Sequence, residues 1–238
     1  MARSRAPRII GRILKLLILL FVVGVSCLVG WRVCASENYD LAKGLKPNEA
    51  LRSAYATHGN DLILQYQTQP SITRADKNYG YFSVVECVFI PQAKQVQLVV
   101  RYNNSTLEHL KADYGLAEVP DRTKDWYDVT LAITTDLTPE NTTDNILPET
   151  LQKQRIHATG EPIRENTKLY TYRRYTFDNV EITEDTIGVF VDINYLGDTN
   201  ELGQIDYEKE AYGTLLIYEK GAKWEPYRLS REEKKLLK

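Results

Sequence analysis

The sequence predicts a mainly β protein that is attached to a membrane by one N-terminal helix. Three observations support this: residues 16–31 carry no charged side chain, apolar and polar residues tend to alternate from Tyr79 onward, and neither a strand–helix–strand rhythm nor an internal repeat occurs. Short connections between strands favour antiparallel pairing. We therefore expect an antiparallel β-sandwich of immunoglobulin-like type with short helices in its loops. The alternative is an α+β domain, in which a helix packs on a twisted antiparallel sheet.

Residues 13–33 form the expected transmembrane anchor. A helix needs about 20 mostly apolar residues to cross about 30 Å of hydrocarbon, and this segment is long enough if Lys15 extends toward the headgroups. Five cations precede residue 16, whereas the first acidic residue is Glu37. Because basic flanks stay in the cytoplasm, we expect a single-pass protein of the cell membrane with a cytoplasmic N-terminus and an extracytoplasmic C-terminal domain. The residues expected to contact lipid include Leu16, Leu20, Val23 and Trp31.

Two alternatives to a retained anchor stay open. Small residues at Val33 and Ala35 would suit cleavage of a signal peptide before Ser36. Cys27 would suit a lipid attachment site, although the apolar residues 28–31 that follow it are unusual for a mature N-terminus. Both alternatives still place residues 37–238 outside the cytoplasm. A buried core helix is disfavoured by the one-sided charge.

The chain divides into five segments under this interpretation: a basic cytoplasmic tail (1–12), the anchor (13–33), a stalk with a helical preface (34–78), a β-rich extracytoplasmic domain (79–228) and a charged C-terminal helix (229–238). Helices are expected over residues 47–57 and 107–113, with a helical turn over 148–154. The expected strands cover residues 62–67, 81–90, 96–102, 126–134, 169–177, 187–195 and 213–218.

The clearest alternation in the chain runs from Ile187 to Tyr195. A pleated strand directs alternate side chains to opposite faces. We therefore expect Asp192 and Asn194 to face solvent, and the four β-branched residues to face the core: Ile187, Val189, Val191 and Ile193.

Charge and cysteine content exclude several classes of protein. Residues 37–238 contain 24 Lys and Arg against 32 Asp and Glu, a net charge of −8. This disfavours nucleic acid or an anionic lipid surface as the main partner. Of the three cysteines, only Cys87 lies outside the anchor region. We expect it to be a small buried apolar residue. We expect neither a disulfide scaffold nor a cofactor.

No catalytic or metal-binding motif is recognisable. None of the three histidines, His58, His109 and His157, has another His or a Cys at the sequence spacing of a metal site. We expect all three to be solvent-exposed. One acidic loop resembles a calcium loop but lacks the Glu that should end it, since Lys209 stands there. It is either a solvated loop or a looser calcium site that uses Asp198, Asn200, Asp206 and Glu208.

A strand rich in tyrosine and arginine gives the one candidate interaction face. Tyr170, Tyr172 and Arg174 alternate along it and so share a face. Such a composition is typical of contact surfaces, but also of an ordinary half-buried strand. Glycosylation sequons occur at Asn103, Asn104 and Asn141, which matter only in a host that glycosylates.

These observations favour a membrane-anchored, non-enzymatic binding or scaffolding module of the cell envelope, whose partner is another envelope protein or a ligand. One alternative is an extracytoplasmic hydrolase that uses a pair of carboxylates. Another is an accessory subunit of a membrane protein complex.

Overall fold

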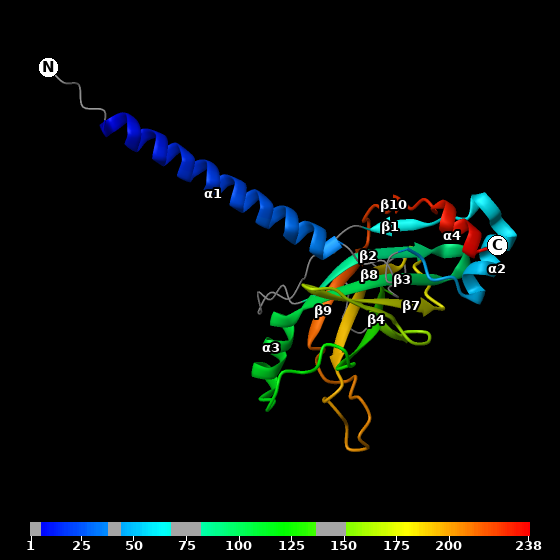
Figure 1. Cartoon of the computed structure of the whole chain (residues 1–238). Coiled ribbons are helices and arrows are strands. Elements are labelled where there is room, and N and C mark those ends of the chain that lie inside the picture. Colours follow the sequence, from blue (N-terminus) through cyan, green and yellow to red (C-terminus); the bar gives the residue numbers. More distant parts are fainter. Residues whose placement is uncertain (1–5, 38–43, 68–81, 137–150) are drawn as a thin grey trace, which may run out of the picture.

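The computed structural model describes residues 6–37, 44–67, 82–136 and 151–238 (Figure 1). It is mainly β, with two antiparallel sheets and a long apolar N-terminal helix, as the sequence predicts. Sheet A has six strands in the following order: β10 (Glu225–Pro226), β1 (Gln65–Gln67), β2 (Phe82–Ile90), β3 (Gln95–Asn103), β7 (Tyr170–Asp178) and β6 (Ile163–Asn166). Sheet B has four: β5 (Leu151–His157), β4 (Tyr127–Asp136), β8 (Thr186–Tyr195) and β9 (Gly213–Glu219).

The main core lies between the two sheets. Alternate residues of β2, β3 and β7 meet alternate residues of β4, β8 and β9 in one apolar cluster. Leu98 on β3 and Leu131 on β4 are both fully buried in it. An aromatic group occupies one end of this cluster, where the rings of Phe82, Tyr102 and Trp126 pack within 6 Å of one another.

A second, smaller core covers the outer face of sheet A. Helix α2 (Glu49–His58) begins where the Asn48 side chain accepts a hydrogen bond from the Leu51 amide. Leu51 then packs with Val88 and Ile90 of β2. The α+β alternative predicts a helix that packs on a sheet. Helix α2 packs on sheet A in this way, in addition to the core between the two sheets.

The C-terminal helix α4 (Arg231–Leu236) closes this second core. Ser230 and Glu233 form a reciprocal cap at its start, as the sequence pattern indicates. The Glu233 carboxylate also accepts hydrogen bonds from the Leu45 amide at 2.8 Å and the Tyr227 hydroxyl at 2.7 Å. A single buried carboxylate therefore joins the last helix to the segment that precedes α2.

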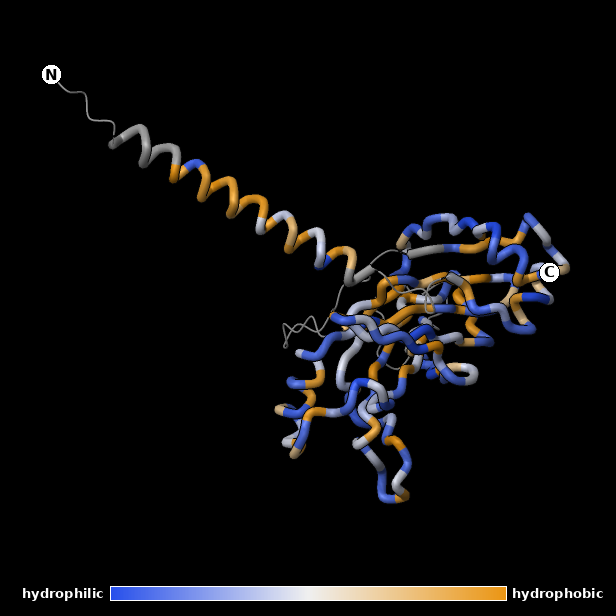
Figure 2. The backbone as a smooth tube through the Cα atoms, viewed as in Figure 1, coloured by the Kyte–Doolittle hydropathy of each residue, from blue (hydrophilic) through white to orange (hydrophobic). Residues whose placement is uncertain are grey.

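Helix α1 (Ala6–Glu37) contains a stretch, Ile13–Cys34, that is long and apolar enough to cross a membrane. No part of this stretch is buried inside the protein, and Figure 2 shows that hydrophobic residues predominate along it. The side chains of Leu16, Leu20, Val23 and Trp31 are all at least half exposed. Such a helix is compatible with a single-pass anchor or with a signal sequence.

Strand β8 confirms three of the four expected core positions, but its other face is buried as well, contrary to the expectation. Val189, Val191 and Ile193 are fully buried, whereas Ile187 is only half-buried. Asp192 and Asn194, expected in solvent, are only 4% and 5% exposed. Other side chains satisfy them: Asn194 Nδ2 donates to Thr130 Oγ1 at 3.2 Å, and Asp192 accepts from Thr214 at 2.9 Å.

Both faces of β8 should therefore be sensitive to substitution. Val191→Ala is expected to lower the free energy of unfolding by about 1–3 kcal/mol through lost burial and an unfilled cavity. Asn194→Ala should cost about 1–2 kcal/mol, because it leaves Thr130 buried with one bond fewer. Urea denaturation of the full chain in detergent micelles measures both, with the exposed Lys220→Ala as control. A loss at Asn194 no larger than at Lys220 would contradict the burial of this face.

Several predicted elements differ from the structure in type or extent. Residues 151–154, expected in a helical turn, belong to strand β5, while 148–150 lie outside the described residues. Helix α3 (Asn104–Tyr114) begins earlier than expected because the Asn103 side chain caps it. Asn103 and Asn104 of the sequons thus lie at a helix start, and Asn141 falls outside the described residues. The short strands β6 and β10 were not predicted.

Candidate anion-binding site

The predicted interaction face lies on β7, but most of it is not accessible. Tyr172 and Arg174 are 0% and 1% exposed, and Tyr170 is half-buried. Arg174 Nη2 lies 2.8 Å from Glu86 Oε1 of β2, and the Arg101 guanidinium lies 4.5 Å from the centre of the Tyr170 ring. Of the two interpretations of this strand, the structure favours an ordinary strand whose side chains pack with neighbours on the same face of sheet A.

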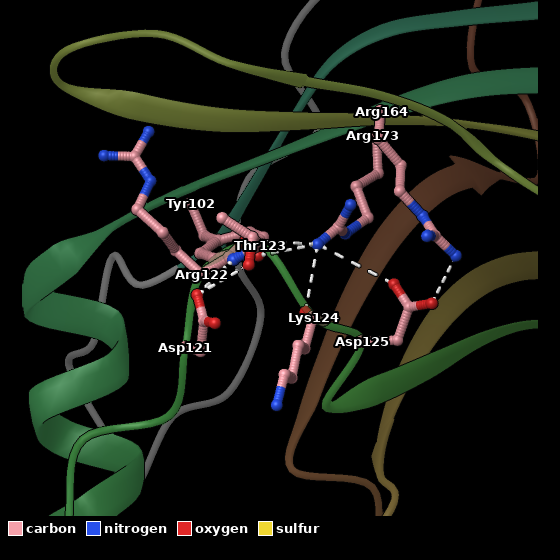
Figure 3. A network of polar contacts seen from close by, with 8 residues as sticks. All are labelled: Tyr102, Asp121, Arg122, Thr123, Lys124, Asp125, Arg164 and Arg173. Atoms are coloured by element: carbon pink, nitrogen blue, oxygen red, sulfur yellow. Dashed lines mark hydrogen bonds and ion pairs between the residues drawn. The ribbon is translucent and has the colours of Figure 1, made fainter.

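The opposite face of β7 carries a fully buried cation, Arg173. It points between the sheets, toward the connection between α3 and β4 (residues 115–126). This connection begins at Gly115, whose φ of +61° ends α3 in the left-handed conformation. Arg173 Nη2 donates to the Tyr102 hydroxyl at 3.2 Å and to the main-chain carbonyls of Arg122 at 3.4 Å and Lys124 at 3.2 Å (Figure 3).

Asp125 lies between this buried arginine and an exposed one. Its Oδ1 is 3.7 Å from Arg173 Nη2, while its Oδ2 accepts a hydrogen bond from Arg164 Nη2 of β6 (Figure 3). The side chains of Asp125 and Arg164 are 37% and 38% exposed. The pair therefore forms the solvent side of a site whose inner wall is Arg173.

Within the described part of the chain, three buried donors close to this pair have no hydrogen-bond partner. They are Arg173 Nε, Arg173 Nη1 and Trp126 Nε1. The rings of Trp126 and Tyr127 both pack against Tyr102, at 5.4 and 5.5 Å between centroids. Burial raises the pKa of Tyr127, so its hydroxyl stays neutral. A buried donor without a partner lowers the stability of the fold, and the loss is largest for a charged guanidinium.

Local charge at this end of the protein contrasts with the acidic domain around it. Arg122, Lys124, Arg164 and Arg173 gather here, and of the carboxylates drawn in Figure 3 only Asp125 contacts the two arginines. No motif in the sequence points to this cluster. The available signal was the run from Arg122 to Asp125 in a connection, together with two adjacent arginines in a strand. Such an arrangement of donors can hold an anionic group.

The acidic loop between β8 and β9 uses its oxygens internally. Asp198 accepts from the Tyr114 hydroxyl at 2.7 Å, and Asn200 Oδ1 accepts from the amides of Leu202 and Gln204. Asp206 Oδ1 accepts from the amide of Glu208, whose own carboxylate lies 3.8 Å from Arg155. Among the residues that the structure describes, no group of three or more His, Cys, Asp or Glu could hold a metal ion. The looser calcium site is therefore not supported.

The three histidines and Cys87 lie on other elements than β6 and β7, which carry Arg164 and Arg173. His58 and His109 are exposed on α2 and α3. His157 is also exposed, and its Nδ1 lies 3.8 Å from Asp128 on sheet B. Cys87 is fully buried, and burial raises the pKa of its thiol to about 12, so it stays protonated at neutral pH.

Comparisons of the chain with models of protein families, with curated proteins and with solved structures found no match. The geometry of the sites described above is therefore the basis for assigning a function.

Proposed function

We propose that this chain is a single-pass, membrane-anchored binding module of the cell envelope, with an immunoglobulin-like extracytoplasmic domain. One observation carries the binding role: a fully buried arginine, Arg173, retains unpartnered donors behind a partly exposed Asp125–Arg164 pair. A buried cation costs more stability than an apolar side chain of the same size. Its retention at the edge of the core is physically reasonable if a ligand or partner supplies the missing acceptors.

Anion binding at this site can be measured directly. The thermal unfolding midpoint of the full chain in detergent micelles should rise with acetate or phosphate, relative to chloride at equal ionic strength, because a ligand that binds the folded state stabilises it. Arg164→Gln should reduce the rise, whereas Arg228→Gln, at an exposed position away from the site, should not. If neither anion shifts the midpoint, the arginine cluster is not a binding site.

The membrane topology gives a separate prediction. Because the cations precede the apolar segment, protease added to intact cells with permeabilised walls should remove the C-terminal domain while sparing a short membrane-embedded fragment. Immunoblotting against N- and C-terminal tags would reveal both products. Full protection of the C-terminal tag in intact cells, with digestion after lysis, would reverse the topology. A soluble product that begins at residue 36 would indicate a cleaved signal peptide.

A further inference from the structure

The site around Arg173 already holds one carboxylate, that of Asp125. We propose that its natural ligand is a small molecule bearing a carboxylate group, which replaces Asp125 between Arg164 and Arg173. This inference rests on the proposed binding function and names the chemical class of its ligand.

The contact between Asp125 and Arg173 is incomplete. Arg173 Nη2 is 3.7 Å from Asp125 Oδ1, which is too long for a hydrogen bond. Asp125 is held by the main chain next to Trp126 and reaches Arg164 well, but it does not reach Arg173 fully. A carboxylate without this covalent tether can approach both guanidinium groups, which bind carboxylates through paired N–H donors.

The surrounding donors favour an acceptor-rich ligand. Arg173 Nε and Nη1 and Trp126 Nε1 can only donate hydrogen bonds, and none of them has an acceptor among the residues that the structure describes. A carboxylate offers acceptors only, with about four lone-pair sites on its two oxygens. Exchange of one carboxylate for another also leaves the charge between the two arginines unchanged, so no new charge is buried.

Charge and access together limit the size of the ligand. Residues 37–238 carry a net charge of −8, which repels an extended polyanion as it approaches. Asp125 and Arg164 are both more than a third exposed, so the Asp125 side chain can turn toward solvent without unpacking the core. Arg173 itself is fully buried. A ligand that replaces the Asp125 side chain therefore needs to present only a single carboxylate group to the two arginines.

The decisive experiment removes the internal competitor. Asp125→Asn abolishes the resident charge, so sodium acetate should bind the full chain in detergent micelles about tenfold more tightly than it binds the unchanged protein, because the site is no longer occupied. Asp121→Asn is the matched control: it removes the same charge from the same connection, but the Asp121 carboxylate accepts hydrogen bonds from Thr123 and not from the two arginines. It should leave acetate binding unchanged. Titration at constant ionic strength, followed by the thermal midpoint and by tryptophan fluorescence, measures both.

A third variant, Arg164→Gln, and a second anion, phosphate, complete the test. Arg164→Gln, at a partly exposed side chain, should fold and bind acetate about tenfold more weakly; unchanged binding would overturn the proposal. Equal acetate affinity in Asp125→Asn and Asp121→Asn would also overturn it, because Asp125 would then not compete. If phosphate binds with the same dependence on Arg164 but acetate does not, the carboxylate class is wrong while the binding function stands. If no anion binds any variant, both proposals fail.

Discussion

Glu233→Gln is expected to destabilise the protein by about 3 kcal/mol. The carboxylate accepts hydrogen bonds from the amides of Leu45 and Ser230 and from the Tyr227 hydroxyl. Hydrogen bonds to a charged acceptor contribute about 1.5–3 kcal/mol each, and an amide cannot accept at both of its terminal atoms. One buried donor would therefore be left without a partner. Gly44 lies close to the same carboxylate, since a Cβ atom at Gly44 would be 3.3 Å from Glu233 Oε1.

The same carboxylate predicts how stability depends on pH. Burial raises the pKa of Glu233, but the hydrogen bonds from Leu45 and Ser230 outweigh it and hold the pKa below its ordinary value of 4.5. A group with a lowered folded-state pKa stabilises the protein above its unfolded-state pKa and loses this contribution as the pH falls through the folded-state value. The stabilising effect of Glu233 should therefore be complete near pH 6 and decline below about pH 4.5.

Urea titrations of the full chain in detergent micelles at several pH values test both statements. The difference in unfolding free energy between the unchanged protein and Glu233→Gln should shrink as the pH falls below about 4.5. Glu232→Gln, one residue earlier on the exposed side of α4, is the matched control and should show no such difference. A difference that is constant from neutral to acidic pH would show that the ionised carboxylate is not what joins α4 to Leu45.

Leu131→Ala is expected to lower the free energy of unfolding by about 3 kcal/mol. Leu131 is fully buried at the centre of β4, where it lies opposite Ile156 on one side and Val191 on the other. Truncation of a buried leucine removes its transfer free energy and leaves a cavity, and the sum is typically 2–5 kcal/mol. Regular strands on both sides restrict collapse of that cavity.

Val119→Ala provides the comparison for Leu131→Ala. Val119 lies in the connection between α3 and β4 with an exposed side chain, and its truncation should cost less than about 0.5 kcal/mol. The same urea denaturation measures both variants. A similar small loss at both positions would show that the two sheets do not enclose a close-packed core.

Hydrophobic alternation predicted the strands well where one face is purely apolar. Val189, Val191 and Ile193 were placed correctly for this reason. Alternation could not predict that Asp192 and Asn194 are buried too, because their partners come from other strands, as Thr130 shows at a separation of 64 residues. The pairing of distant polar side chains leaves no local pattern in the sequence.

Strand β7 shows a second limit of sequence reasoning. Arg173 and Arg174 are adjacent, so one arginine must lie on each face, and a periodic pattern cannot tell which face is inside. The face with Arg174 was considered as a possible interaction face because of its tyrosine and arginine content, with an ordinary half-buried strand as the alternative. The structure buries both arginines, and the site with unpartnered donors is on the other face. The strands β6 and β10 are too short to produce any periodic signal.

The bond between Glu233 and Leu45 has a mechanical consequence if the anchor is retained. Tension between a membrane and the folded domain enters the described domain at residues 44–48, just after the segment that follows α1 (Figure 1). There the Leu45 amide donates a hydrogen bond to Glu233 of α4. The Gln97 side chain of β3 forms hydrogen bonds with both the amide and the carbonyl of Lys46. Helix α4 therefore helps to hold residues 44–48 in place when a force is transmitted from the membrane. Removal of α4 would therefore loosen the domain at the residues where such a force enters it.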